Sequence, residues 1–169
     1  PSLLTGDYLR STLPLLPGPP ATLAQMLSVH GYATAAFYPN GIFFCDDPRA
    51  TAYEQRQFGF RDAWAQSTNA PQLTDRVLSY LHELHGQGDA KFFLWVHYFD
   101  VHEPYLNHEA YSFGTRDVDR YDSGIAYVDD QIGRLVAALG QFTRPTILVL
   151  TADHGEEFLD HGGNYHGSS

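Results

Sequence analysis

The sequence ends on TADHGEEFLDHGGNYHGSS, where four carboxylates are interleaved with three histidines. Asp153 and His154 place a carboxylate oxygen beside an imidazole nitrogen, a combination that suits a divalent cation of hard or intermediate character. Neighbouring residues of an extended chain point to opposite faces, so both can hold one ion only if the chain turns, which Gly155 permits. The alternative is an aspartate that caps a helix, with a hydrogen-bonded histidine beside it. The pair is therefore a candidate metal site.

Two further histidines, His161 and His166, follow in the glycine-rich stretch DHGGNYHGSS. Such loops can approach a ligand closely, and an imidazole there could bind an oxyanion or protonate a leaving oxygen. The alternative is an ordinary polar end segment. Both histidines are therefore candidates for contact with an anionic group.

A second histidine cluster lies in WVHYFDVHEPY. His97 falls inside an apolar run and is interpreted as a core histidine, while Asp100 ends that run and could cap or orient the following loop. His102 lies in this loop ahead of Pro104, where its side chain could reach into a cleft. An ordinary surface histidine is the alternative for His102.

Each cluster begins where a predicted buried strand ends. The runs KFFLWVHYF at 91–99 and PTILVLT at 145–151 are apolar and rich in β-branched or aromatic residues, as buried strands are. A helix predicted at about 118–139 joins them, which is the pattern of a right-handed crossover between parallel strands. Because parallel strands end at one edge of a sheet, we expect His102 and Asp153 to meet there.

The rest of the chain alternates strands with helices, which predicts a mainly parallel α/β sheet. Thr22 is a predicted N-cap, with Gln25 three residues later as in a capping box, for a helix that runs to about His30. The other predicted elements are a strand at 32–38 and a helix at 71–85, with irregular segments at 39–70 and 100–117.

The composition narrows the class of protein. A chain of 169 residues with 43% hydrophobic content is long enough for one globular domain. Its formal net charge of -10 argues against a general nucleic-acid binder, which needs clustered Lys and Arg. The longest apolar run, FFLWV, is far shorter than a membrane span, and no signal peptide is visible. Cys45 is the only cysteine, so an internal disulfide is excluded, and we interpret it as a packed or loop thiol.

The sequence resembles the sulfatase family of the alkaline-phosphatase superfamily. TADHGEEFLDHGGNYHG is similar to that family's T/S-A/S-D-H-G-E-x-x-x-x-H-G-x-x-x-H/K stretch, and FFLWVHYFDVHEPY is similar to its strand and H-x-P-Y loop. YDSGIAYVDDQIGRL resembles the helix between them, PSLLTG the tail of the nucleophile motif, and ATLAQMLSVHGYATAAF the helix–strand unit that follows it. The matches span nearly the whole chain in the family's order. The resemblance implies an alkaline-phosphatase-like α/β sandwich, incomplete here, with a mainly parallel central sheet and helices on both faces.

The resemblance also implies roles for individual residues. Asp153 and His154 correspond to metal ligands, and His102 to the histidine that contacts the sulfate or phosphate group. His166 takes the place of a lysine or histidine near the substrate anion and the leaving group. The implied cofactor is one divalent metal, Ca²⁺ in the first place, with Mn²⁺ or Mg²⁺ as alternatives. No role carries over to His161, Glu156 and Glu157, which we interpret as supports of the loop.

The sequence departs from the family pattern at its start. The family's nucleophile is a cysteine converted to formylglycine, or a serine or threonine, just upstream of the residues that match Pro1 and Ser2. An Asp pair that completes the metal site lies on an earlier strand, and Cys45 lies in the wrong context to replace the nucleophile. We therefore expect 1–169 to be a partial sulfatase catalytic domain that begins just after the nucleophile motif, ends within the active-site loop and is inactive alone.

The resemblance implies a metal-dependent sulfuric-ester hydrolase that acts by in-line attack at sulfur on an anionic ester. A phosphodiester or phosphonate hydrolase, or a phospho-headgroup transferase of the same superfamily, acting on a phosphate ester, is the first alternative. A non-catalytic truncated module is the alternative from another class. The identity of the nucleophile discriminates best among the three. The family implies a periplasmic or extracellular location, which the sequence itself leaves open.

Overall fold

The structure, a computed structural model, describes residues 21–39, 57–88, 90–163 and 165–166. The chain divides into two compact units, Pro1–Phe99 and Asp100–Ser169. The first unit contains a parallel sheet with helices on both of its faces, and the second contains a long helix with the loops that pack on it. Each unit is described by itself below.

The sheet of the first unit has three parallel strands in the order β2-β1-β3. The central strand β1, Ala33–Tyr38, is buried over almost its whole length because it has a neighbour on each side. The flanking strands are β2, Asp62–Ala65, and β3, Phe92–Val96, both mostly half-buried. Parallel pairing of these segments confirms the predicted α/β class.

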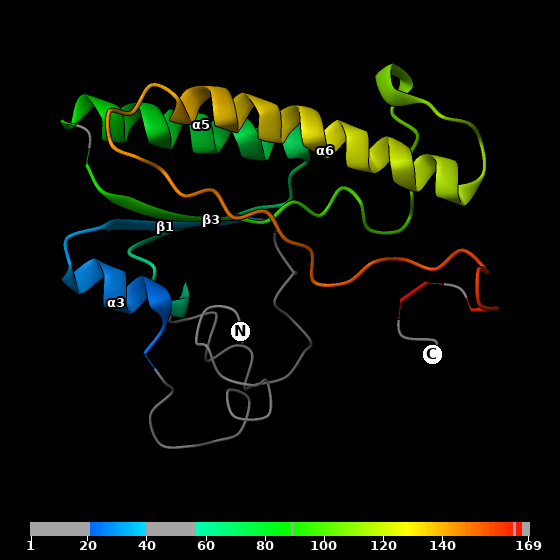
Figure 1. Ribbon diagram of the computed structural model, residues 1–169, viewed down its shortest axis with the longest axis horizontal. Coiled ribbons are helices and arrows are strands. Elements are labelled where there is room, and N and C mark those ends of the chain that lie inside the picture. Colours follow the sequence, from blue (N-terminus) through cyan, green and yellow to red (C-terminus); the bar gives the residue numbers. More distant parts are fainter. Residues whose placement is uncertain (1–20, 40–56, 89, 164, 167–169) are drawn as a thin grey trace. The chain divides into compact units, whose positions relative to one another are not determined.

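Two helices cover opposite faces of this sheet, α3 at Leu23–Val29 and α5 at Ala70–Gly86 (Figure 1). Because successive residues of a strand point to opposite faces, Phe37 of β1 faces α5, where its ring contacts that of Tyr80 with centroids 5.5 Å apart. The face toward α3 is filled by a cluster of buried residues, Ala24, Ala36, Tyr38, Phe58 and Phe60.

The ends of α3 follow the sequence signals. The Thr22 hydroxyl accepts the Gln25 backbone N–H at 3.2 Å, and the Gln25 side chain accepts the Thr22 backbone N–H at 2.9 Å, so the predicted capping box is confirmed. Thr22 also donates to the Phe58 carbonyl at 2.6 Å, which ties the helix start to the neighbouring 3₁₀ turn η1, Gln57–Gly59. After the helix, Gly31 has φ of +77°, a backbone conformation that favours glycine.

Helix α5 places one apolar face against the sheet. Asn69 caps it through a hydrogen bond from the Gln72 backbone N–H at 3.1 Å. The buried positions recur at helical spacing, which explains why the sequence pattern located this helix within a residue at each end. They are Leu73, Val77, Leu81 and Leu84.

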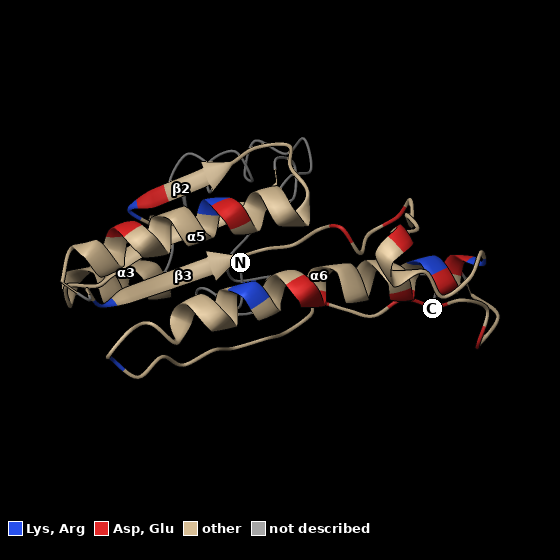
Figure 2. Ribbon diagram, turned by 90° about the horizontal axis from the view of Figure 1, so that it is seen from above, with Lys and Arg blue, Asp and Glu red and all other residues tan. Residues whose placement is uncertain are grey.

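The second unit is built on α6, Asp117–Leu139, preceded by the 3₁₀ turn η2, Glu109–Tyr111. At its start the Asp119 carboxylate accepts hydrogen bonds from the Arg116 backbone N–H at 3.0 Å and from its guanidinium at 3.0 and 2.6 Å. These bonds use an N-terminal N–H that the helix itself cannot satisfy. Acidic and basic positions are interspersed along α5 and α6, without a basic stripe on either helix (Figure 2).

Three sequence predictions need correction. The predicted strand at 145–151 is wrong, because 145–150 adopts no strand and its apolar side chains are exposed, with Ile147 at 90% and Val149 at 75%. A strand needs a paired neighbour, and the described part of the second unit contains no extended strand to pair with it. The predicted strand at 91–99 shortens to Phe92–Val96, and β2 lies within a segment read as irregular.

None of the described helices combines the length and the apolar character that a membrane crossing requires.

Candidate active site

The loop that carries His102 is fastened to α6 at two small residues. The hydroxyl of Ser123, which is fully buried, accepts the His108 backbone N–H at 2.8 Å. One residue later, a Cβ on Gly124 would lie 3.2 Å from the Asp100 carbonyl oxygen, so the absent side chain lets the loop backbone approach the helix closely. This contact fixes the backbone immediately before His102.

Aromatic packing fixes the remainder of that loop. The ring of Tyr105 contacts those of Tyr121 and Phe158, with centroids 5.8 and 5.5 Å apart, and Tyr121 contacts Phe158 at 5.3 Å. His108 stacks on Tyr127 at 3.7 Å. Because Phe158 belongs to the C-terminal segment, this packing joins the loop, α6 and that segment.

The C-terminal segment reverses direction through hydrogen bonds of its own backbone. The carboxylate oxygen Oε1 of Glu157 accepts the backbone N–H groups of His161 at 2.8 Å and Gly163 at 3.0 Å. Leu159 donates to the Gly163 carbonyl at 2.9 Å, and Tyr165 donates to the Glu157 carbonyl at 3.1 Å. This cross-linked turn returns the chain so that residue 166 lies beside residues 154 and 156.

The consequence is a cluster of three histidines. The imidazole of His166 stacks on that of His154 with centroids 4.1 Å apart and contacts that of His102 edge-on at 5.5 Å. The structure thus brings together the histidine of the HEPY loop and two histidines of the C-terminal segment. Convergence was expected at the edge of a sheet, whereas the structure produces it by packing loops on α6.

All three imidazoles are anchored through Nδ1. The Nδ1 of His102 lies 2.8 Å from the Glu103 carbonyl oxygen, and that of His154 lies 2.8 Å from the Gly155 carbonyl oxygen. The Nδ1 of His166 lies 3.2 Å from Oε2 of Glu156. Since carbonyl and carboxylate oxygens only accept, each Nδ1 carries the proton that is shared, and Nε2 is left to face other partners.

Asp153 and His154 fit the first requirement of a metal site. Oδ2 of Asp153 lies 3.6 Å from Nε2 of His154, so one cation could touch both atoms. The bond from Nδ1 to a backbone carbonyl orients the ring as in many metal-bound histidines. Within the described ranges, however, no group of three or more His, Cys, Asp or Glu side chains is placed to hold an ion. The pair could supply two ligands of a larger shell.

The sequence did not predict that the side chain of Glu156 is buried beside His166. Its side chain is 4% exposed, and besides His166 it faces the buried hydroxyl of Tyr105. Burial alone would raise the pKa of Glu156, but the nearby Tyr105 hydroxyl and the imidazole of His166 lower it overall. Burial and the Glu156 carboxylate together raise the pKa of Tyr105. The only sequence signal was the position of Glu156 two residues after His154.

Other residues singled out from the sequence lie elsewhere. The side chain of His161 is 89% exposed, with Nδ1 3.8 Å from Oε1 of Glu157. His97 follows β3 in the first unit, where its backbone N–H donates to the Phe37 carbonyl at 2.9 Å and its ring is half-buried. Cys45, Pro1 and Ser2 lie outside the described residues.

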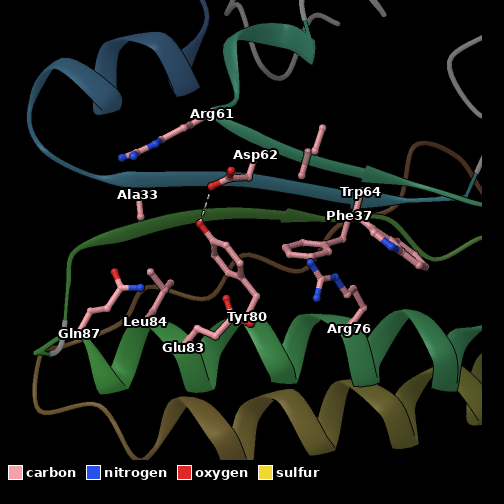
Figure 3. Close-up of a pocket in the computed structure, with 12 residues that line it drawn as sticks. Ala33, Phe37, Arg61, Asp62, Trp64, Arg76, Tyr80, Glu83, Leu84 and Gln87 are labelled. Carbon is pink, nitrogen blue, oxygen red and sulfur yellow. Dashed lines mark hydrogen bonds between the residues drawn. The ribbon is translucent and has the colours of Figure 1, made fainter.

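A pocket of about 390 Å³ opens in the first unit between the sheet and α5 (Figure 3). Tyr80 reaches from α5 toward the sheet and donates to Oδ2 of Asp62 at 3.1 Å, while Arg76 lies near Phe37 and Trp64. Burial, followed by the charge of Asp62 and this hydrogen bond, raises the pKa of Tyr80 to about 12. None of the candidate catalytic or metal-binding residues lines this pocket. The charged residues that line it are exposed to solvent.

Comparison with known proteins bears on the histidine cluster. A family model described as Sulfatase matches residues 1–169, the whole chain. The chain belongs to the sulfatase family. Members of this family generally use a divalent metal. A search of the curated proteins finds no match.

Solved structures support the fold. The lipoteichoic acid synthase LtaP from Listeria monocytogenes matches 81% of this chain with a TM-score of 0.58 and 16% identity, over 36% of its own length. A protein of the alkaline phosphatase superfamily from Vibrio parahaemolyticus matches 81% of the chain at a TM-score of 0.55 and 18% identity, over 34% of its length. Ps i-CgsB, solved with k-i-k-neocarrahexaose, matches 83% at 0.56 and 16% identity, over 43% of its length. The sulfatase-family chain therefore has an alkaline-phosphatase-like fold and spans less than half the length of each of these neighbours.

Proposed function

We propose that this chain forms part of the catalytic centre of a metal-dependent sulfuric-ester hydrolase. The observation that carries the proposal is the cluster of His102, His154 and His166, in which the His166 ring lies 4.1 Å from that of His154 and 5.5 Å from that of His102, with Nδ1 anchored in each. A surface histidine needs no such anchoring, whereas a ring that must present one nitrogen to a ligand does.

The proposed roles follow from the atoms that face the cluster. Asp153 and His154 would hold a divalent cation, for which Ca²⁺ is proposed first and Mn²⁺ or Mg²⁺ second, because carboxylate oxygen and imidazole nitrogen suit all three to different degrees. When bound, the cation supplies positive charge that stabilises the oxygens of an anionic ester. His102 and His166, when protonated on both ring nitrogens, would donate hydrogen bonds to those oxygens from Nε2.

The proposed reaction is in-line displacement at sulfur. The nucleophile would be the hydroxyl group that the family pattern places just upstream of Pro1; its proton passes to water, and its oxygen forms a bond to sulfur as the bond from sulfur to the leaving oxygen breaks. The electron pair of the broken bond stays on the leaving oxygen, and His166, with a proton on each ring nitrogen at this step, donates the proton on Nε2 to that oxygen. Water then releases sulfate from the enzyme.

The overall acidity of the chain is compatible with an anionic substrate. The formal net charge is -10, but three imidazoles and a cation at one place make the local potential favourable for an anion. Phosphate esters offer similar oxygens, so the reaction class is decided by assay.

The test uses the protein as the cell makes it, with a bound divalent metal. Initial rates are measured on 4-nitrophenyl sulfate, 4-nitrophenyl phosphate and bis(4-nitrophenyl) phosphate for the natural protein, His166→Ala and His161→Ala. We expect sulfate turnover that His166→Ala lowers by about 10²–10⁴-fold, the usual range for loss of a general acid. His161→Ala is the matched control because its exposed side chain is removed from the same loop. Phosphate turnover without sulfate turnover would contradict the proposal in favour of phosphoryl transfer, and equal effects of both variants would contradict the role of His166.

A further inference from the structure

The carboxylate of Glu156 is buried in a segment most of whose residues are exposed. Its side chain is 4% exposed, whereas Gly155 beside it is exposed, as is most of the segment that follows. Burial of a carboxylate is unfavourable unless hydrogen bonds or an opposite charge compensate it. A buried acid in this position therefore calls for a partner.

Each oxygen of the carboxylate has a defined neighbour. Oε2 lies 3.2 Å from Nδ1 of His166. Oε1 and the Tyr105 hydroxyl are both buried, and neither completes a well-directed hydrogen bond within the described residues, yet each group shifts the pKa of the other. Tyr105 thus borders the side of the carboxylate that His166 does not use.

The surroundings hold Glu156 in place. Tyr105 cannot swing away because its ring is packed against Tyr121 and Phe158. The backbone that follows Glu156 is restrained by the turn in which Glu157 accepts two N–H groups. The carboxylate therefore has a fixed position from which to orient a ring.

We propose that Glu156 is a positioning residue for His166: it accepts Nδ1–H of the ring, with Tyr105 packed behind it, so that Nε2 faces the substrate oxygens. This inference rests on the proposed function, because it gives His166 a role in the reaction. Without Glu156, the ring of His166 could rotate, and rotation would carry Nε2 away from the reacting oxygen.

The adjacent Glu157 shows that a glutamate at this place in the loop does not contact His166 merely because of its position in the sequence. Glu157 accepts the backbone N–H groups of His161 and Gly163, and the exposed imidazole of His161 lies 3.8 Å from its carboxylate. Two neighbouring glutamates thus have different tasks: one holds the loop, and the other holds the imidazole of the proposed site.

A double-mutant cycle tests the proposal in the full natural protein. We measure kcat and KM for Glu156→Ala, His166→Ala and the double variant, with Asp160→Ala as the matched control for an exposed carboxylate of the same loop. Glu156→Ala should lower kcat by about 10–100-fold with little change in KM, as losses of orienting partners do. The double variant should be no slower than His166→Ala, because Glu156 acts only through that ring. Additive losses would overturn the proposal.

A second readout does not depend on turnover. Long-range ¹H–¹⁵N NMR spectra identify which nitrogen of His166 carries the proton in the natural protein. We expect protonated Nδ1, and a mixed or reversed pattern in Glu156→Ala that Glu156→Gln restores, since the amide oxygen can still accept. An unprotonated Nδ1 in the natural protein would overturn the proposal even if the alanine variant fails to fold. Full activity of His166→Ala would overturn the proposed role of His166, while the spectrum would still report on its bond to Glu156.

Discussion

Replacement of Glu157 should loosen the turn that brings His166 to the site. Its Oε1 accepts two backbone N–H groups, at 2.8 Å from His161 and 3.0 Å from Gly163. Hydrogen bonds to a charged acceptor contribute about 1.5–3 kcal/mol when buried, and since this side chain is 20% exposed we take about 1 kcal/mol for each. Glu157→Ala should then cost about 2 kcal/mol, which raises the opening equilibrium of the turn about 30-fold.

Hydrogen exchange of the two amides measures this opening directly. In Glu157→Ala the His161 and Gly163 amides should exchange about 30-fold faster, because exchange from a locally opened loop follows the opening equilibrium. Glu157→Gln keeps an acceptor at the same place and should change exchange by less than about fivefold. Exposed Asp160→Ala serves as the control. Unchanged exchange in the alanine variant, or equal effects of alanine and glutamine, would refute the role assigned to Glu157.

Three further outcomes are expected. Thr22→Val removes both the cap of α3 and a buried bond to a loop carbonyl, so urea unfolding should show a loss of about 1–2 kcal/mol, which Thr22→Ser avoids. Hydrogen bonds from Arg116 lower the pKa of Asp119 below its ordinary 3.8, so their stabilisation of α6 is present above that pH and is lost as pH falls through the folded pKa. Acid titration by circular dichroism should show this loss, and it should be absent in Asp119→Asn. The pKa of Tyr80 is raised to about 12 by burial and Asp62, so the neutral phenol stabilises the fold below pH 10.0 and the effect is lost as pH rises to about 12. The ultraviolet phenolate titration of Tyr80→Phe should lack one step near that pH, and loss of a step near 10.0 instead would contradict the assignment.

Local signals in the sequence located the helices well. Thr22 and Gln25 specify the start of α3 because a capping box is made within one turn, and the apolar spacing of α5 is a property of that helix alone. Strands were harder. The run at 145–151 has the composition of a buried strand, but a strand also requires a neighbouring backbone, which composition does not reveal. β2 was missed because Asp62–Ala65 is short and polar at its start.

Some residues of the candidate site could be predicted from local sequence signals, and others could not. The chemical types of Asp153, His154, His102 and His166 could be read from their motifs, and the structure places the three histidines together. The environment of Glu156 could not be read, because it depends on Tyr105, which lies on another loop and approaches only through packing on α6. Residues that orient a reacting group are often distant in sequence, and such contacts leave little local signal.

A crystal structure of the full natural protein, grown with Mn²⁺ and inorganic sulfate, tests the central claim most directly. Anomalous difference density at the manganese edge identifies the position of the cation directly from the diffraction data. We expect the anomalous peak to touch a carboxylate oxygen of Asp153 and Nε2 of His154, with sulfate oxygens in hydrogen-bond range of Nε2 in His102 and His166. A manganese peak on other residues, with no anion at the three histidines, would contradict the assignment of this cluster as the catalytic centre.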